Sequence, residues 1–516
     1  MRSRRALLAL FSTLGLACSA SVQPPAPDAG PTDASAVDAA PATDAGPVEI
    51  AWGTCPDRFR DQCATLRMPL DHDDPTGEQI DVFVSRRGTG SRQLWLLQGG
   101  PGASAESFFG LHDFLTTIDP ELEVYTIEHR GVGSSTRLGC AAEAEGSIAG
   151  SQITTEEWPA CQAEVVATWG DRLESFTTTQ AAHDLALAIE RTRRPGQEVF
   201  VYGGSYGTYW ANRYAVLHPE QPTGLILDAP VSPGSDLSVY DLQFEPIGRR
   251  IFRELCPMSP ACSSHLGADP EAFLERVFAS LGTGQCRQLG VDLATWKVVF
   301  GVFLMDYNLR NWLPALVYRL DRCSSGDRTA IATLFGNLFG GGAGLPRTSH
   351  VLQVHQVLSE FFPRTHVDDA PIAAARASAI FFQDALADAY LLQDGWPRSA
   401  VDPHAASYAP PEVPVLVMAG ALDPAAPVET VGAGYREHLT GPHQTFVEIP
   451  YGAHTVLTSA PVGGGMPSCS VQLVRAFLAD PASALPVSCA GEVLVPSLDA
   501  PADLAMRYWG TPTLYE

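Results

Sequence analysis

A stretch near the middle of the chain constrains the fold most. An apolar run at residues 199–202 leads into Gly-Gly-Ser-Tyr-Gly at 203–207, and a helical pattern follows directly. A strand, a glycine turn and a helix in this order hold a serine at the tip of a sharp turn, where its hydroxyl is exposed. Glycines two residues before and after Ser205 let the strand and the helix approach closely. We interpret Ser205 as a nucleophile, the alternative being a glycine-rich turn without catalytic function.

Other short runs rich in β-branched or aromatic residues alternate with helical patterns on both sides of this turn. We expect helices at 178–193, capped by Thr178 or Thr179, and at 206–217. Strands alternating with helices predict a mostly parallel sheet with its active residues at the carboxyl ends of the strands. The predicted strands are 80–86, 93–97, 123–127, 199–202, 224–227, 413–419 and 444–449.

This alternation stops in one long segment. Residues 235–404 are mainly helical by pattern, and the strand pattern resumes after Pro414. An insert between two halves of one sheet is expected to form a lid over the active site. We therefore predict a sheet domain made of residues 49–234 and 405–516, the latter with a C-terminal tail, and a helical lid insert at 235–404.

Two later residues complete a catalytic triad. Asp423 follows a buried strand, and His454 follows the next one, so the order along the chain is serine, aspartate, histidine. In such a triad the histidine takes the serine proton, while the aspartate fixes the histidine tautomer and stabilises the imidazolium. Asp228 also follows a strand and is an alternative acid; otherwise it caps a turn.

An oxyanion at a tetrahedral intermediate needs backbone donors. One is expected from the amide of Tyr206, directly after the nucleophile, and the other from a loop after an early strand. The predicted strand 93–97 runs into Gly-Gly-Pro-Gly at 99–102, where we favour Gly100. The alternative is a Gly-Pro turn with no catalytic part.

The net charge and the absence of certain motifs exclude several classes of binding partner. The formal net charge is −25 over 516 residues. Nucleic acid and anionic membrane surfaces both require a cationic face, so neither is expected as a partner. The sequence has no Cys-x-x-Cys or His-Glu-x-x-His segment, and we predict neither a metal site nor a cofactor.

Residues 1–18 at the N-terminus are predicted to form an export signal. Three arginines precede an apolar run at 6–17, which is too short to span a bilayer. Leu-Ala-Cys at 16–18 resembles a bacterial lipoprotein box and predicts lipidation of Cys18, with ordinary signal cleavage as the alternative. Residues 19–48 are rich in Pro, Ala and Asp, which indicates a disordered acidic tether.

Ten cysteines remain when Cys18 is set aside, and they lie close together in twos along the chain. An exported chain is expected to use them as disulfides, although spacing alone leaves several connectivities open. The neighbouring cysteines are Cys55 and Cys63, Cys140 and Cys161, Cys256 and Cys262, Cys286 and Cys323, and Cys469 and Cys489.

Taken together, these motifs resemble the prolyl iminopeptidase and tripeptidyl aminopeptidase family of α/β-hydrolases, notably its larger secreted bacterial members. The glycine loop at 99–102 is similar to the family's His-Gly-Gly-Pro-Gly segment, with Gln98 in place of histidine. Residues 128–134 are similar to its Asp-x-Arg-Gly-x-Gly-x-Ser segment, with Glu128 in place of aspartate. The resemblance also covers the elbow and the paired-cysteine tail, roughly residues 50–235 and 405–492, and implies an α/β-hydrolase fold. The large, mainly helical lid insert between these parts is predicted from the sequence pattern and not from the resemblance.

This resemblance also implies an activity. The family removes amino acids or short peptides from free N-termini and holds the substrate ammonium with lid carboxylates. Candidates in the insert are Asp236, Asp241 and Glu245, with surface solvation as the alternative for each. The first hypothesis is therefore an exported serine exopeptidase. The others are a secreted esterase or amidase acting on small molecules and a non-catalytic surface lipoprotein of the same fold.

Overall fold

The computed structural model describes residues 50–55, 61–144, 152–339 and 348–516. The predicted export signal, Cys18 and the predicted tether lie outside these residues. Within the described ranges, no helix combines the length and the apolar character that crossing a bilayer requires.

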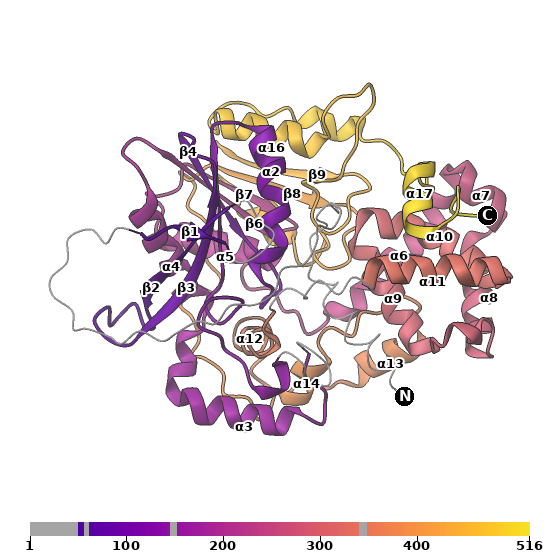
Figure 1. Ribbon diagram of the computed structural model, residues 1–516, viewed down its shortest axis with the longest axis horizontal. Helices are drawn as coiled ribbons and strands as arrows, with labels where there is room; N and C mark the ends of the chain where they lie inside the picture. Colours follow the sequence, from indigo (N-terminus) through magenta and orange to yellow (C-terminus); the bar gives the residue numbers. More distant parts are fainter. Residues whose placement is uncertain (1–49, 56–60, 145–151, 340–347) are drawn as a thin grey trace.

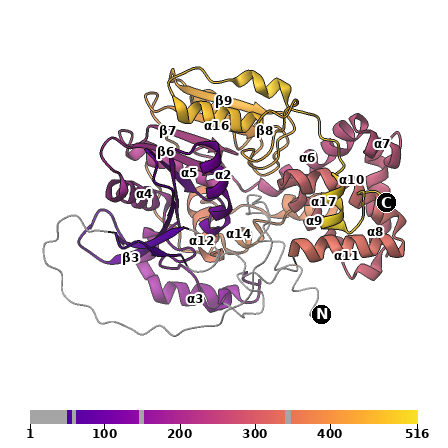
Figure 2. The same ribbon diagram turned by 45° about the horizontal axis from the view of Figure 1, so that its top comes forward.

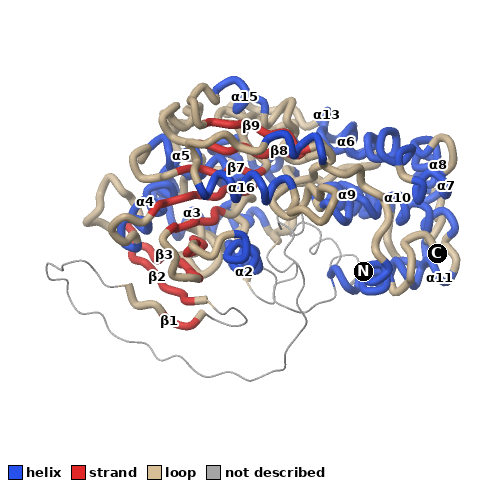
Figure 3. The backbone as a smooth tube through the Cα atoms, turned by 90° about the horizontal axis from the view of Figure 1, so that it is seen from above, coloured by secondary structure: helices blue, strands red, loops and turns tan. Residues whose placement is uncertain are grey.

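One twisted sheet organises the molecule (Figures 1 and 3), and its nine strands within the described residues follow the order β1-β2-β3-β5-β4-β6-β7-β8-β9. The six strands from β5 to β9 in this order pair in parallel, whereas the pairs at the β1 end are antiparallel. The strands are β1 Gly53–Thr54, β2 Gln62–Pro69, β3 Gln79–Arg87, β4 Arg92–Leu97, β5 Leu122–Ile127, β6 Glu198–Gly204, β7 Gly224–Asp228, β8 Val415–Gly420 and β9 Gln444–Ile449.

Helices cover both faces of the sheet and also form the insert between β7 and β8. In chain order they are α2 Phe109–Ile118, α3 Trp158–Trp169, α4 Thr178–Thr192, α5 Tyr206–Leu217, α6 Phe244–Arg250, α7 Pro260–Leu266, α8 Pro270–Gly282, α9 Leu293–Met305, α10 Tyr307–Arg322, α11 Ser325–Phe339, α12 His350–Gln356, α13 Ala370–Ser378, α14 Ala387–Leu392, α15 Ala433–His438, α16 Cys469–Ala479 and α17 Ala502–Trp509.

The sequences of the central strands are unbroken apolar runs because both faces of these strands are covered. In β4, Trp95 and Leu97 belong to the core that α4 and α5 close. The intervening Leu94 and Leu96 belong to the core that α2 and α16 close. Successive side chains of a strand point to opposite faces, so a doubly covered parallel strand must be apolar throughout.

The insert has a hydrophobic core of its own, built by α6 to α11. Residues 405–516 were assigned to the sheet domain with a tail, but the last helix, α17, packs among the insert helices (Figure 2). Trp509 is buried there, and the carbonyl of Leu514 accepts from the Arg319 guanidinium. The segment around α12 instead packs on the sheet domain, where Leu352 joins the core of α4 and α5.

Each strand and helix outside the insert with predicted bounds matches an observed element to within two residues at either end. The predicted cap of α4 at Thr178 or Thr179 is wrong: the Thr177 side chain accepts from the Gln180 amide and is the N-cap. Strands β1 and β2 were not predicted. Strand β2 pairs antiparallel with β3 near the sheet edge and alternates buried and exposed positions, so it lacks the continuous apolar run of the central strands.

Neighbouring cysteines form the five disulfides found among the described residues. Their Cα atoms lie 4.9 to 5.6 Å apart, within the usual range for a disulfide. The bonds are Cys55–Cys63, Cys140–Cys161, Cys256–Cys262, Cys286–Cys323 and Cys469–Cys489.

Candidate active site

Ser205 lies between the end of β6 and the start of α5, with φ 56° and ψ −127°. This backbone region is unfavourable for a residue with a side chain, so the surrounding structure must hold it. A Cβ on Gly203 would lie 2.2 Å from the Gly207 carbonyl oxygen, and one on Gly207 would lie 2.1 Å from that of Leu97. The two glycines are therefore required for β6, α5 and β4 to meet, and the turn presents the Ser205 hydroxyl to a cavity.

His454 and Asp423 form a buried pair in the loops after β9 and β8. The His454 Nδ1 atom lies 2.9 and 3.0 Å from the two Asp423 carboxylate oxygens. An ionised carboxylate only accepts, so Nδ1 carries the proton and Nε2 keeps a free lone pair. The amides of Ala425 and Ala426 donate to Asp423 Oδ1 and orient the carboxylate.

The environment of His454 changes its basicity. Burial lowers the pKa of His454, but the charge of Asp423 and its hydrogen bond raise it, with a smaller contribution from Asp228. The net pKa lies above the ordinary value for histidine. This direction favours a ring that accepts a proton during a reaction.

Asp228, the alternative acid, has a different set of partners. Its carboxylate accepts from the amides of Val456 and Leu457 at 2.7 and 2.9 Å and from the Tyr202 hydroxyl at 2.9 Å. Burial raises the pKa of Asp228 to about 6, although these hydrogen bonds oppose the shift. Asp228 thus holds the backbone that follows His454, and Asp423 is the carboxylate in contact with its ring.

The two predicted oxyanion donors border the same cavity as Ser205 and His454. Gly100 and Tyr206 both line it, and neither amide has an acceptor among the described residues. The preceding amide, that of Gly99, is occupied by the Gln98 side chain at 2.7 Å. Of the two adjacent glycines, Gly100 is therefore the one whose amide is available to a ligand.

Glu128 supports the loop that contains Gly100. Its carboxylate accepts from the Ser104 hydroxyl at 2.6 Å and from the Ala105 amide at 2.9 Å. Burial raises the pKa of Glu128 to about 7, against these hydrogen bonds. The residue that replaces the family's aspartate thus fixes the end of the glycine loop.

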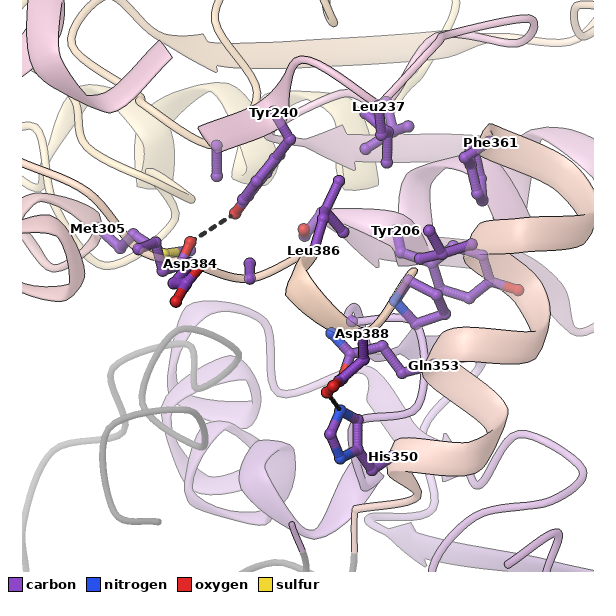
Figure 4. A pocket seen from close by; sticks show the side chains of 18 of the residues that line it. Tyr206, Leu237, Tyr240, Met305, His350, Gln353, Phe361, Asp384, Leu386 and Asp388 are labelled. Carbon is purple, nitrogen blue, oxygen red and sulfur yellow. Dashed lines mark hydrogen bonds and ion pairs between the residues drawn. The ribbon is translucent and has the colours of Figure 1, made fainter. Parts of the chain in front are cut away.

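Lid residues close the cavity, which has a volume of about 120 Å³. Figure 4 shows Tyr240, Met305 and Asp384 on one side of it, and Asp388 on the other, paired with His350. The Asp388 carboxylate lies 2.9 Å from His350 Nε2. Asp384 pairs with Arg376, yet burial and the nearby Asp388 raise its pKa. No lysine or arginine of the described chain lines this cavity.

The three acidic candidates from the sequence do not line the cavity, which corrects that expectation. Asp236 is exposed and accepts from the Ser238 amide. Asp241 and Glu245 bind backbone amides of the loop 380–386, which carries Asp384. Buried carboxylates need hydrogen-bond donors, and here the loop backbone supplies them. Asp384 and Asp388 were missed because no motif or apolar period marks this part of the insert.

The described residues contain no cluster of three or more histidine, cysteine or acidic side chains placed to hold a metal ion. The chemistry that the site itself supports is nucleophilic attack by a serine assisted by a histidine and an aspartate. The available backbone amides can donate hydrogen bonds to a negative charge that develops on the substrate.

Comparison with known proteins agrees with this architecture. The sequence profile of the alpha/beta hydrolase fold matches residues 94–291, which span the glycine loop, the elbow and the start of the insert. The chain has the α/β-hydrolase fold. This confirms the predicted fold class.

Characterised relatives match only part of the chain. A tripeptidyl aminopeptidase of Streptomyces coelicolor is 26% identical over 205 residues, which are 36% of this chain and 38% of that protein. Carboxylesterase B of Mycobacterium tuberculosis is 30% identical over 161 residues, 28% of this chain and 31% of that protein. The matches thus span 38% and 31% of the length of these relatives.

Solved structures with this fold are also similar at low sequence identity. A proline iminopeptidase of Mycobacterium smegmatis is 14% identical with a TM-score of 0.34, covering 81% of this chain and 98% of that one. An esterase of Thermogutta terrifontis is 15% identical with a TM-score of 0.33, covering 81% and 99%.

Proposed function

We propose that this α/β-hydrolase-fold protein is an exported serine exopeptidase that releases amino acids or short peptides from free N-termini. One observation carries the proposal: Ser205, the His454–Asp423 pair and the amides of Gly100 and Tyr206 meet at one cavity. These are the nucleophile, the base with its orienting acid, and the oxyanion donors that acyl transfer requires.

The proposed reaction proceeds through an acyl-enzyme. Ser205 Oγ attacks the scissile carbonyl and gives its proton to His454 Nε2, while the carbonyl oxygen becomes an oxyanion bound by the two amides. His454 then protonates the leaving amine, and the carbon–nitrogen bond breaks. Water attacks the remaining ester by the same route in reverse and frees Ser205.

The cavity supports a substrate with a free ammonium group. Asp384 and Asp388 line it, and no lysine or arginine of the described chain does. The two carboxylates contact Arg376 and His350, respectively. A carboxylate in a half-buried site favours a positively charged ligand. The similarity to a tripeptidyl aminopeptidase points in the same direction.

An esterase acting on small molecules is the second candidate. The higher identity of the two relatives, 30%, is with a carboxylesterase, and the same triad serves ester cleavage. A panel of aminoacyl and tripeptidyl arylamides with free or acetylated N-termini, run beside short-chain esters, separates the two. We expect arylamide turnover that acetylation strongly reduces; ester turnover with no arylamide cleavage would overturn the exopeptidase proposal.

The triad is tested by labelling with a fluorophosphonate. We expect the wild-type protein to be labelled and Ser205→Ala to be inert, while Ser264→Ala, at an exposed serine of the insert, keeps full labelling. An unlabelled wild-type protein that is correctly folded would favour the non-catalytic lipoprotein hypothesis instead.

We further propose that the protein is exported and anchored by a lipid on Cys18. The five disulfides support an oxidising compartment, where such bonds persist. Metabolic labelling with a palmitate analogue in a bacterial host should mark the wild-type chain and not Cys18→Ser. Equal labelling of both would contradict the anchor.

A further inference from the structure

A second hollow, of about 210 Å³, also borders His454. The first cavity is lined by Ser205, the oxyanion donors and the lid carboxylates, and His454 is the one residue common to the two linings. The second hollow is otherwise lined by Tyr307, Asn308, Thr455, Thr458, Ser459, Pro461 and Ser468.

Contacts between the insert and the catalytic loop build this hollow. The His454 amide donates to the Met305 carbonyl at 3.1 Å, and Arg310 Nη2 donates to the Tyr451 carbonyl at 2.7 Å. These two bonds dock the start of α10 against the loop after β9. The side chains of Tyr307 and Asn308 are thereby held at the edge of the hollow that His454 borders.

The reaction needs space near His454 for two different parts of the substrate. The acyl part must stay with Ser205 and the oxyanion amides in the first cavity. The leaving atom must come within hydrogen-bond reach of His454 Nε2, because that nitrogen delivers its proton. A leaving group longer than one atom therefore extends past the imidazole, and the second hollow borders His454.

The lining indicates the chemistry of the occupant. Apart from His454, it has hydroxyl groups, one carboxamide and a proline, and no charged side chain. Hydroxyl and carboxamide groups both donate and accept hydrogen bonds, which matches the N–H and C=O groups of a peptide. The first cavity, with Asp384 and Asp388, instead suits a cationic group.

We propose that the hollow between Asn308 and Thr458 is the leaving-group site, which binds the amine-terminated peptide fragment released on acylation. This proposal deepens the proposed function and rests on its acyl-enzyme. The site also accepts an added amine that attacks the acyl-enzyme. In that step a carbon–nitrogen bond forms and the carbon–Oγ bond breaks. The amine proton passes to His454 Nε2 and then to Ser205 Oγ.

The test measures how the acyl-enzyme divides between water and an added amine. An activated ester generates the acyl-enzyme, and glycinamide or glycyl-leucinamide is added at increasing concentration while both products are quantified. A binding site predicts that the ratio of aminolysis to hydrolysis saturates. We expect Thr458→Trp and Asn308→Trp, both at exposed positions, to raise the half-saturating concentration at least tenfold. Thr329→Trp, at an exposed threonine on α11, is the matched control and should keep the wild-type value.

The outcomes distinguish this site from the proposed function. A ratio that rises linearly in the wild-type protein, or tryptophan variants with unchanged half-saturation, would overturn the leaving-group site and leave the triad intact. Absence of any acyl-enzyme, judged by fluorophosphonate labelling, would overturn both. Both tryptophan variants should still be labelled by a fluorophosphonate, whose leaving group is a single fluoride, which shows that the triad still works.

Discussion

At the scale of single residues, the site depends on contacts between a few side chains that lie far apart in the sequence. Asp423 follows strand β8, Asp228 is the last residue of strand β7, and both are buried beside the histidine loop. Their contacts distinguish them, since Asp423 binds the His454 ring and Asp228 binds the backbone after it. Substituting Asp423 should therefore change the kinetics in a different way from substituting Asp228.

Asp423→Asn should lower kcat by a factor of about 10⁴, because an amide stabilises the wrong imidazole tautomer. The charge of Asp423 raises the pKa of His454, and kcat/KM requires the neutral ring. Its loss should shift the acid limb of the kcat/KM profile to lower pH. Residual kcat/KM measured from pH 4 to 9 checks this, and an acid limb at the wild-type position would contradict the pairing.

Gly99→Ala should disable the site through crowding. A Cβ there would lie 2.8 Å from the Ser205 Cβ and 2.9 Å from the Gly204 carbonyl oxygen. We expect about 1–3 kcal/mol lower unfolding free energy from overpacking, together with a large loss of fluorophosphonate labelling. Gly336→Ala, in an exposed helix position with open space around it, is the control and should stabilise by about 0.5–1 kcal/mol. Unaltered labelling of Gly99→Ala would refute the close approach.

At the scale of elements, short loops carry the site and helices position them. The loop 380–386 brings Asp384 to the cavity, and Asp384 itself has a left-handed φ of 61°. Glu245 on α6 and Asp241 just before it bind the amides of this loop. Such clamps hold a loop in a conformation that its own sequence does not favour.

Asp241→Ala should release one end of that loop. The amides of Ala385 and Leu386 lose their acceptor, so Asp384 becomes less well placed for a substrate ammonium. We expect KM for substrates with a free N-terminus to rise about tenfold, with little change for an uncharged ester. Asp236→Ala, at an exposed carboxylate of the same segment, is the control. Equal changes for both substrates would show that the clamp acts on the whole site instead.

At the scale of the whole molecule, two hydrophobic cores meet at the active site. One lies between the sheet and the helices α4 and α5, and the other holds the insert together with α17. Ser205 comes from the first, whereas Tyr240 and Met305 reach the cavity from the insert. A less stable insert is therefore expected to weaken substrate binding more than it impairs the triad.

The disulfides of the insert are expected to contribute to its stability. Cys286–Cys323 closes 37 residues and Cys256–Cys262 only 6. Chain-entropy arguments give losses of about 4 and 2 kcal/mol for the Cys286→Ser/Cys323→Ser and Cys256→Ser/Cys262→Ser double variants. Urea unfolding followed by tryptophan fluorescence measures both. A larger effect of the shorter loop would show that native packing, and not chain entropy, sets the order.

The sequence by itself determined the parts of this protein that depend on neighbouring residues. Helix 206–217, the central strands and the elbow at Ser205 all follow from apolar periods and glycine spacing within short windows. The α/β-hydrolase class is implied by the resemblance of these motifs to a known family. The sequence also predicted Asp423 as the acid, and the tertiary contacts with His454 decided between it and Asp228. Tertiary structure alone decided the cavity carboxylates Asp384 and Asp388 and the position of α17 on the insert. Each of these depends on contacts between segments far apart in the chain, and a local pattern contains no information about which distant surface will cover it.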